Sequence, residues 1–141
     1  MKTARTIKDS FLNLGVRGKI PLIAVDEMHK RQARGEKFLI IDVREKSEFD
    51  GPDGRIPGAV SVPFLKAIGK APGMIDQASE PAILVCRKGL RSWIALALSG
   101  VRGRDVYSLK GGMKAWNKRG FEVVGKIGRA VTVERRRREK C

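Results

Sequence analysis

A cysteine flanked by basic residues is the part of the sequence best suited to chemistry. Residues 82–92 read Ala-Ile-Leu-Val-Cys-Arg-Lys-Gly-Leu-Arg-Ser, so Cys86 directly follows an apolar run typical of one buried strand, and a helix is expected next. A short loop between a strand and a helix directs backbone N–H groups and the positive end of the helix toward one point. This helix end and the basic side chains of the loop favour a thiolate. We therefore predict that the loop holds an anionic sulfur species on Cys86.

The residues that follow Cys86 are expected to bind the substrate. Their N–H groups and cations surround the sulfur, and the cations also attract an anionic sulfur donor. These residues are Arg87, Lys88, Gly89, Leu90, Arg91 and Ser92. Ser92 is a suitable N-cap for the helix, and Arg91 should close the loop. Two alternatives remain open: Cys86 could be an inert core cysteine, and Lys88 could be a solvated surface charge.

Two charged residues at the end of a second apolar run are expected to support the loop. Residues 38–43 read Phe-Leu-Ile-Ile-Asp-Val, which is typical of a strand buried on both faces, and Arg44 follows. Sites in parallel sheets form at the carboxyl ends of the strands, so Asp42 and Arg44 could lie beside Cys86. We interpret Asp42 as structural. For Arg44, a structural role and anion binding remain equally open.

The number of histidines and cysteines, and the spacing of residues after Cys86, argue against other cysteine chemistry and against a metal site. Four residues separate Cys86 from Arg91. A loop of this length encircles a small space, which suits a sulfur atom better than a tetrahedral phosphate. The only histidine, His29, falls on the first predicted helix of the main domain, where we interpret it as a surface residue, so no base can be placed beside Cys86. One histidine and two cysteines do not suffice for a dedicated zinc site. We predict no metal and no cofactor.

The predicted elements alternate between strands and helices, which indicates an α/β fold. That order favours a central parallel sheet with helices on both faces. Strands are expected at residues 22–25, 38–43, 59–62, 82–85 and 105–109. Helices are expected at residues 27–34, 45–49, 64–70, after Ser92 and at 113–118, with residues 71–80 as a loop of weak helical content.

Length, composition and charge indicate one globular domain with basic extensions. The 141 residues, 42% of them hydrophobic, suffice for a core, and the formal net charge is +15. Residues 1–20 hold five basic residues and one acidic residue, a charge of +4; residues 125–141 hold seven basic and two acidic residues, a charge of +5. We therefore predict an N-terminal extension with a short amphipathic helix at 1–20, a main domain at 21–124 and a basic tail at 125–141.

The number of cysteines indicates the cellular compartment, and the basic tail indicates which partners are possible. Two cysteines, one of them the terminal Cys141, cannot form a disulfide framework, so we expect a reducing compartment and a cytoplasmic location. No apolar run approaches the roughly 20 residues of a membrane span. The four arginines at 135–138 favour a solubilising tail; docking to an acidic protein, a nucleic acid or a membrane surface is the alternative. Cys141 as a second sulfur carrier is less favoured.

The sequence resembles the single-domain rhodaneses, a family of sulfurtransferases, over roughly three quarters of its length. Four segments occur in the family's order. They are Leu39-Ile-Ile-Asp-Val-Arg-Glu, Gly54-Arg-Ile-Pro-Gly-Ala-Val, Val85-Cys-Arg-Lys-Gly-Leu-Arg-Ser and Val106-Tyr-Ser-Leu-Lys-Gly-Gly-Met-Lys-Ala-Trp. The resemblance implies a rhodanese-like parallel sheet and a catalytic cysteine, at the position of Cys86, that carries sulfur as a persulfide.

The resemblance also implies the substrates. The donor would be thiosulfate, a polysulfide or a persulfide, and the acceptor a thiol or cyanide. One departure bears on the donor: as we align it, Glu48 occupies a position near which members active on thiosulfate can carry Arg, and an acid there weakens the attraction of a dianion. The alternative function is a non-catalytic binding module, or a sulfur carrier, that docks to an anionic partner through its basic ends.

Overall fold

Five parallel strands form the centre of the domain. The computed structural model describes residues 20–101, 105–125 and 130–131. The order in the sheet is β1-β5-β4-β2-β3, and every pairing is parallel. The strands are β1 (Leu22–Ile23), β2 (Leu39–Asp42), β3 (Val60–Ser61), β4 (Ala82–Val85) and β5 (Val106–Leu109). The apolar β4 lies in the middle because a central parallel strand is covered on both faces.

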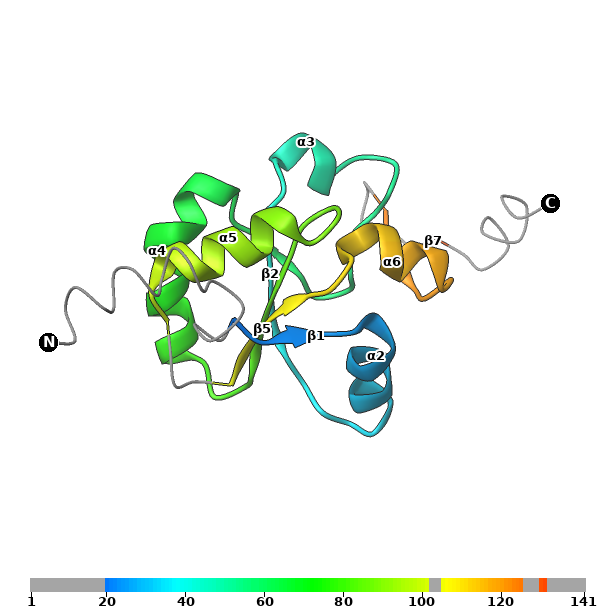
Figure 1. Cartoon of the computed structure of the whole chain (residues 1–141). Coiled ribbons are helices and arrows are strands. Elements are labelled where there is room, and N and C mark those ends of the chain that lie inside the picture. Colours follow the sequence, from blue (N-terminus) through cyan, green and yellow to red (C-terminus); the bar gives the residue numbers. More distant parts are fainter. Residues whose placement is uncertain (1–19, 102–104, 126–129, 132–141) are drawn as a thin grey trace, which may run out of the picture.

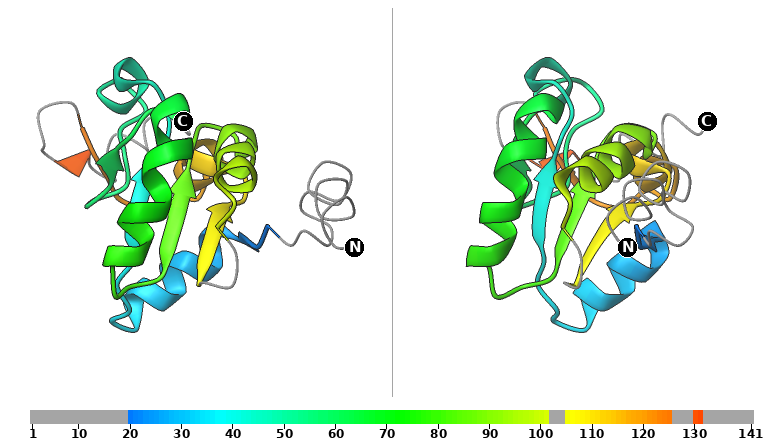
Figure 2. Two further views of the ribbon diagram at one scale, coloured as in Figure 1. Left: turned by 90° about the vertical axis from the view of Figure 1, so that its left-hand side faces the viewer. Right: turned by 60° about the vertical axis from the view of Figure 1, so that its left-hand side comes forward.

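Helices cover both faces of this sheet, as Figure 1 shows. Two of them, α4 (Phe64–Gln77) and α5 (Leu90–Ser99), pack on one face. On the other face lie α2 (Val25–Ala33) and α6 (Gly112–Lys118). The short α3 (Lys46–Phe49) follows β2 at the end of the domain toward which the strands run (Figure 2). The predicted α/β fold with helices on both faces is confirmed.

The side chains of β4 alternate between two apolar clusters, one on each face of the sheet. Ala82 and Leu84 belong to the cluster under α4 and α5, whereas Ile83 and Val85 belong to the cluster under α2 and α6. This alternation follows from the two-residue period of a strand. All four side chains have no measurable exposure, so the strand that leads to Cys86 is held from both sides.

Helix α4 is longer than we predict from the sequence. α4 continues through residues 71–77, which we expected to form a loop, and it contains Pro72. Ala67, Ala71 and Ile75 are spaced four residues apart on one face and are buried against the sheet. The burial of this face outweighs the hydrogen bond that Pro72 cannot donate and the low helix propensity of the neighbouring glycines.

After α6 the chain forms two short paired strands. β6 (Val123–Val124) pairs antiparallel with β7 (Ala130–Val131), and Val124 also bridges Arg55. The predicted N-terminal helix and Cys141 lie outside the described residues, and of the predicted basic tail, 125–141, only residues 125 and 130–131 are described. In the part of the chain that the structure describes, no helix combines the length and the apolar character needed to cross a membrane.

Candidate active site at the cysteine loop

Cys86 begins a loop at the carboxyl end of β4, beside a cavity of about 300 Å³. The cavity is lined by Cys86, Arg87, Lys88, Leu90 and Arg91. The whole Cys86 residue is only 1% exposed, whereas its basic neighbours in the loop are exposed. The thiol therefore lies at the base of a cavity whose rim carries positive charge, and a donor must present a small sulfur atom to reach it.

A backbone amide is directed at the sulfur of Cys86. The Gly89 N–H donates a hydrogen bond to Cys86 Sγ at 3.0 Å. Gly89 adopts a φ of +103°, a conformation that residues with a side chain rarely adopt, and this turn brings its N–H back over Cys86. A hydrogen bond from a backbone N–H favours a sulfur that carries negative charge. Of the N–H groups expected around the sulfur, that of Gly89 donates to it in the structure.

The start of α5 differs from the prediction. The helix begins at Leu90 with Gly89 as its N-cap, so the expectation that Ser92 is the N-cap is wrong. The positive φ of Gly89 turns the chain early enough for Leu90 and Arg91 to form the first turn. Ser92 is therefore inside the helix and fully buried, where its hydroxyl donates to the Gly89 carbonyl at 3.2 Å. Ser92 does not line the cavity that Leu90 and Arg91 border.

Two glycines allow α6 to pack directly beneath the cysteine loop. The N–H groups of Met113 and Lys114, in the first turn of α6, donate to the carbonyls of Cys86 and Arg87 at 2.8 and 2.9 Å. A Cβ placed on Gly112 would overlap the Cys86 carbonyl oxygen. We expected this helix to begin at residue 113 and did not predict its contact with the cysteine loop, for which the adjacent pair of glycines before a helix is the available signal.

Arg91 is paired with an acid from another element. Its two terminal nitrogens donate to the two carboxylate oxygens of Glu48, on α3, at 2.7 and 2.9 Å. These hydrogen bonds lower the pKa of Glu48 to about 2, from 4.5, and raise the pKa of Arg91. Attraction to Cys86 contributes less to the raised pKa of Arg91. The positive charge nearest the helix start is thus partly neutralised at the rim of the cavity.

Asp42 and Arg44 form an ion pair at the carboxyl end of β2, the strand beside β4, and are not among the residues that line the cavity. Arg44 Nη2 donates to Asp42 at 2.8 Å and to the Gly54 carbonyl at 2.9 Å, and both charged residues are at most 1% exposed. These contacts occupy the guanidinium with protein acceptors. The geometry matches the structural interpretation of Asp42, and of the two alternatives for Arg44 it favours the structural one.

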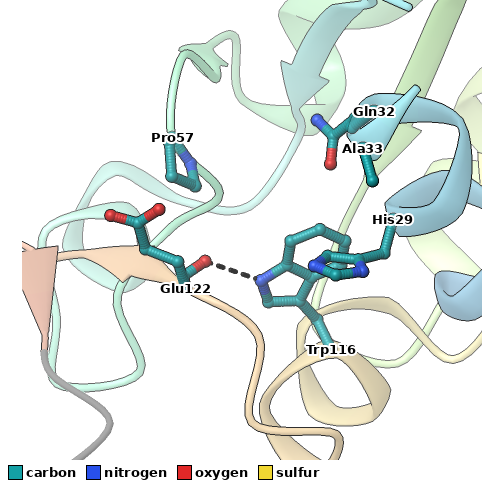
Figure 3. A pocket seen from close by; sticks show the side chains of 6 residues that line it. All are labelled: His29, Gln32, Ala33, Pro57, Trp116 and Glu122. Atoms are coloured by element: carbon teal, nitrogen blue, oxygen red, sulfur yellow. Dashed lines mark hydrogen bonds between the residues drawn. The ribbon is translucent and has the colours of Figure 1, made fainter. Parts of the chain in front are cut away.

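A second cavity, of about 280 Å³, lies where α2 and α6 meet a loop (Figure 3). It is lined by His29, Gln32, Ala33, Pro57, Trp116 and Glu122. His29 is exposed on α2, as the sequence analysis predicts, and its ring stacks on Phe121 with centroids 3.8 Å apart. Trp116 donates to the Glu122 carbonyl at 2.9 Å and is 2% exposed. Within residues 20–101, 105–125 and 130–131, no three His, Cys, Asp or Glu residues are grouped so as to hold a metal.

Known proteins resemble this chain in sequence and in fold. A family model described as "Rhodanese-like domain" matches residues 24–119. A protein named "Sulfurtransferase" from Allochromatium vinosum is 30% identical over 104 residues, which cover 73% of this chain and 94% of that protein. "Adenylyltransferase and sulfurtransferase MOCS3" from Drosophila sechellia is 34% identical over 106 residues, covering 67% of this chain.

The relatives differ in how much of their length this chain represents. The match spans 22% of the Drosophila sechellia protein, and a match to "Uncharacterized protein YqhL" from Bacillus subtilis, 37% identical over 81 residues or 57% of this chain, spans 61% of that protein. Among solved structures, a thiosulfate sulfurtransferase from Pseudomonas aeruginosa has a TM-score of 0.66 at 19% identity, over 89% of this chain and 26% of that one. At this identity the structural likeness supports the fold alone.

Proposed function

This chain belongs to the rhodanese-like domain family, and from that premise we propose that Cys86 accepts a sulfane sulfur, carries it as a persulfide and passes it to an acceptor. At the level of the family, the chain is related to sulfurtransferases. The donor and acceptor are our proposal: thiosulfate, a polysulfide or a persulfide as donor, and a thiol or cyanide as acceptor. We also propose a cytoplasmic location, because a working thiolate needs a reducing compartment.

The first half of the reaction loads Cys86. Its thiolate attacks the outer sulfur of thiosulfate, so a new S–S bond forms on Cys86 while the S–S bond of thiosulfate breaks. Sulfite leaves with the bonding electron pair, and Cys86 keeps the sulfur as a persulfide anion. With a polysulfide or persulfide donor the leaving group is a thiolate or a shorter polysulfide instead. No oxidant, reductant or cofactor enters the balance.

The second half of the reaction unloads Cys86. A thiolate acceptor attacks the outer sulfur, the persulfide S–S bond breaks, and its electron pair returns to Cys86 as the thiolate. Cyanide attacks the same atom and leaves as thiocyanate. Both halves require negative charge on sulfur at the base of the cavity, which the Gly89 N–H and the basic rim are placed to stabilise.

One observation carries this proposal: the Gly89 N–H donates to Cys86 Sγ at 3.0 Å beside a cavity lined by three basic residues. A structural cysteine in a core also accepts hydrogen bonds, but it would not border a cavity large enough for a small anion. The basic side chains at the rim attract anionic donors. Added salt screens this attraction, so it acts over a shorter distance. We therefore expect loading by anionic donors to slow at high ionic strength.

Intact-protein mass spectrometry tests the proposal after separate exposure to thiosulfate, polysulfide and glutathione persulfide. The wild type and Cys141→Ser should gain the mass of one sulfur atom, and cyanide should remove it as thiocyanate. Cys86→Ser should gain none. A wild type that stays unmodified with all three donors would overturn the proposal and favour a binding module. In that case salt-sensitive binding to an acidic protein, lost on deletion of residues 125–141, becomes the function to measure.

A further inference from the structure

Two serine hydroxyls lie in the core beneath the cysteine loop, at positions where apolar side chains are expected. Ser108 on β5 is paired with Leu84 on β4, and Val106, two residues earlier on the same face, is part of the apolar cluster under α5. Ser92 and Ser108 both have no measurable exposure. Burying a hydroxyl costs free energy unless it is hydrogen-bonded, so this pair needs a physical explanation.

The two hydroxyls form a directed chain of hydrogen bonds that leads to Cys86. The Ser92 hydroxyl donates to the Gly89 carbonyl at 3.2 Å, and Ser92 Oγ lies 2.7 Å from Ser108 Oγ. Because a serine has one hydroxyl proton, and Ser92 gives its proton to Gly89, Ser108 must donate to Ser92. Gly89 in turn donates its N–H to Cys86 Sγ at 3.0 Å. Two buried side chains and one backbone residue thus connect β5 to the sulfur.

We propose that Ser108 and Ser92 are positioning residues that hold Gly89 so that its N–H meets the Cys86 sulfur. This inference rests on the proposed role of Cys86 as a sulfur carrier. Gly89 has a φ of +103° and a ψ of −12°, and a glycine has more backbone freedom than any other residue, so its orientation needs restraint from outside. Its carbonyl also accepts from the Trp93 N–H, at the longer distance of 3.3 Å. Without Ser92, the carbonyl keeps the hydrogen bond from the Trp93 N–H but loses its connection to β5.

The orientation of Gly89 affects the chemistry because its N–H donates a hydrogen bond to an anionic sulfur. The Cys86 thiolate and the Cys86 persulfide both carry negative charge, and a hydrogen bond to a charged group contributes more than one between neutral groups. Loss of the restraint should slow thiolate chemistry at Cys86 by about tenfold. The charged groups around the cavity, Arg87, Lys88, Arg91 and its partner Glu48, are unchanged in the serine variants, so they cannot cause the difference.

The test compares Ser92→Ala, Ser108→Ala and the double variant, each combined with Cys141→Ser so that one thiol reacts. The rate of alkylation by iodoacetamide is measured across pH, and sulfur loading from thiosulfate is measured by mass spectrometry. Ser99→Ala is the matched control, because Ser99 Oγ donates to the Leu96 carbonyl at 2.7 Å in the same helix, three residues back, with no contact to the loop. Thermal unfolding is followed for every variant.

The double variant separates positioning from simple stabilisation. Removing both hydroxyls leaves no buried hydroxyl without a partner, so its stability should stay near that of the wild type. Alkylation should nevertheless be about tenfold slower at neutral pH, and its pH profile should be displaced toward higher pH. Ser99→Ala should match the wild type. A folded double variant that alkylates and loads sulfur at wild-type rates would overturn the inference, whatever its melting temperature.

Further outcomes keep the two proposals distinguishable. If Ser92→Ala does not fold, Ser108→Ala serves alone: a smaller slowing in the same direction supports the inference, and wild-type alkylation contradicts it. If no donor loads sulfur onto the wild type but the serine variants still alkylate slowly, the proposed function fails and the positioning role stands. If the wild type loads sulfur and the double variant does so equally fast, only the positioning role fails.

Discussion

Two cavities of nearly equal volume, about 300 and 280 Å³, differ in what forms them. The Cys86 cavity lies where a parallel strand ends and a helix begins, with a backbone N–H directed at a thiol and basic residues at its rim. The cavity between α2 and α6 is bordered by the rings of His29 and Trp116, the side chains of Gln32 and Ala33, and loop residues.

The difference shows that volume alone does not identify a site. In the second cavity, the ring of His29 is stacked on Phe121 and Trp116 meets the same ring edge-on at 5.1 Å, so the aromatic groups are engaged with one another. In the first cavity, Cys86, whose sulfur accepts from the Gly89 N–H, borders a space that no described side chain fills. A cysteine at the end of a strand, with a backbone amide directed at its sulfur, distinguishes the first cavity from the second. Four predictions test this contrast, in order of decreasing effect.

The largest effect is expected for Gly112→Ala. The new Cβ would overlap the Cys86 carbonyl, and α6 could no longer pack beneath the cysteine loop. We expect sulfur transfer to fall at least about 100-fold, because the loop that aims the Gly89 N–H loses its support. The measurement is the rate of thiocyanate formation. Gly35→Ala is the matched control: Gly35 also has a positive φ, +96°, but open space around its Cβ position, so it should lose some stability and keep its activity.

Glu48→Gln should change the preference for the donor's charge. Glu48 partly neutralises Arg91 at the rim of the Cys86 cavity, and removing its charge strengthens the attraction of a dianion more than that of a monoanion. Thiosulfate and methanethiosulfonate differ by one charge and share the same reacting sulfur. We expect the ratio of their kcat/KM values to move toward thiosulfate by about three- to tenfold. An unchanged ratio, with Asp50→Asn as the charge control, would show that Glu48 does not act on the donor.

Acid should weaken the rim of the Cys86 cavity in the wild type. The pKa of Glu48 is about 2 in the folded chain and 4.5 when it is unpaired, so the pair with Arg91 stabilises the fold above pH 4.5 and ceases to do so as the pH falls toward 2. We expect Glu48→Gln to be less stable at pH 7 by about 1 kcal/mol, allowing for solvent screening of this partly exposed pair. Urea unfolding should show that the difference shrinks between pH 4.5 and 2. A difference in stability that stays constant from pH 4.5 to 2 would contradict the lowered pKa of Glu48.

The smallest effect on sulfur transfer is expected for His29→Ala in the second cavity. The variant loses a stacking partner of Phe121, which should lower stability by about 0.5–1.5 kcal/mol. Because His29 lies on α2 and does not border the Cys86 cavity, sulfur loading and transfer should be unchanged. Thermal unfolding and the thiocyanate assay measure the two quantities. A loss of transfer in a folded His29→Ala protein would mean that the second cavity takes part in the reaction.

Much of the fold could be predicted from local patterns. The five strands follow apolar runs, and the α/β order follows from their alternation with helical segments. The errors arise where distant packing overrides a local signal. α4 passes through Pro72 because Ala71 and Ile75 are buried on the sheet, and α5 begins before Ser92 because Gly89 adopts a positive φ. Neither the buried face of α4 nor the φ of Gly89 can be read from neighbouring residues.

The site divides in the same way. The types and spacing of residues 86–91 were sufficient to predict a cysteine in a basic loop between a strand and a helix, because that arrangement depends on neighbours in the chain. Only the tertiary structure brought Glu48 to Arg91, Ser108 to Ser92 and Gly112 to the Cys86 carbonyl. These partners come from α3, β5 and α6. Their contacts depend on how strands far apart in sequence pair and how helices pack on them, which no short stretch of sequence specifies.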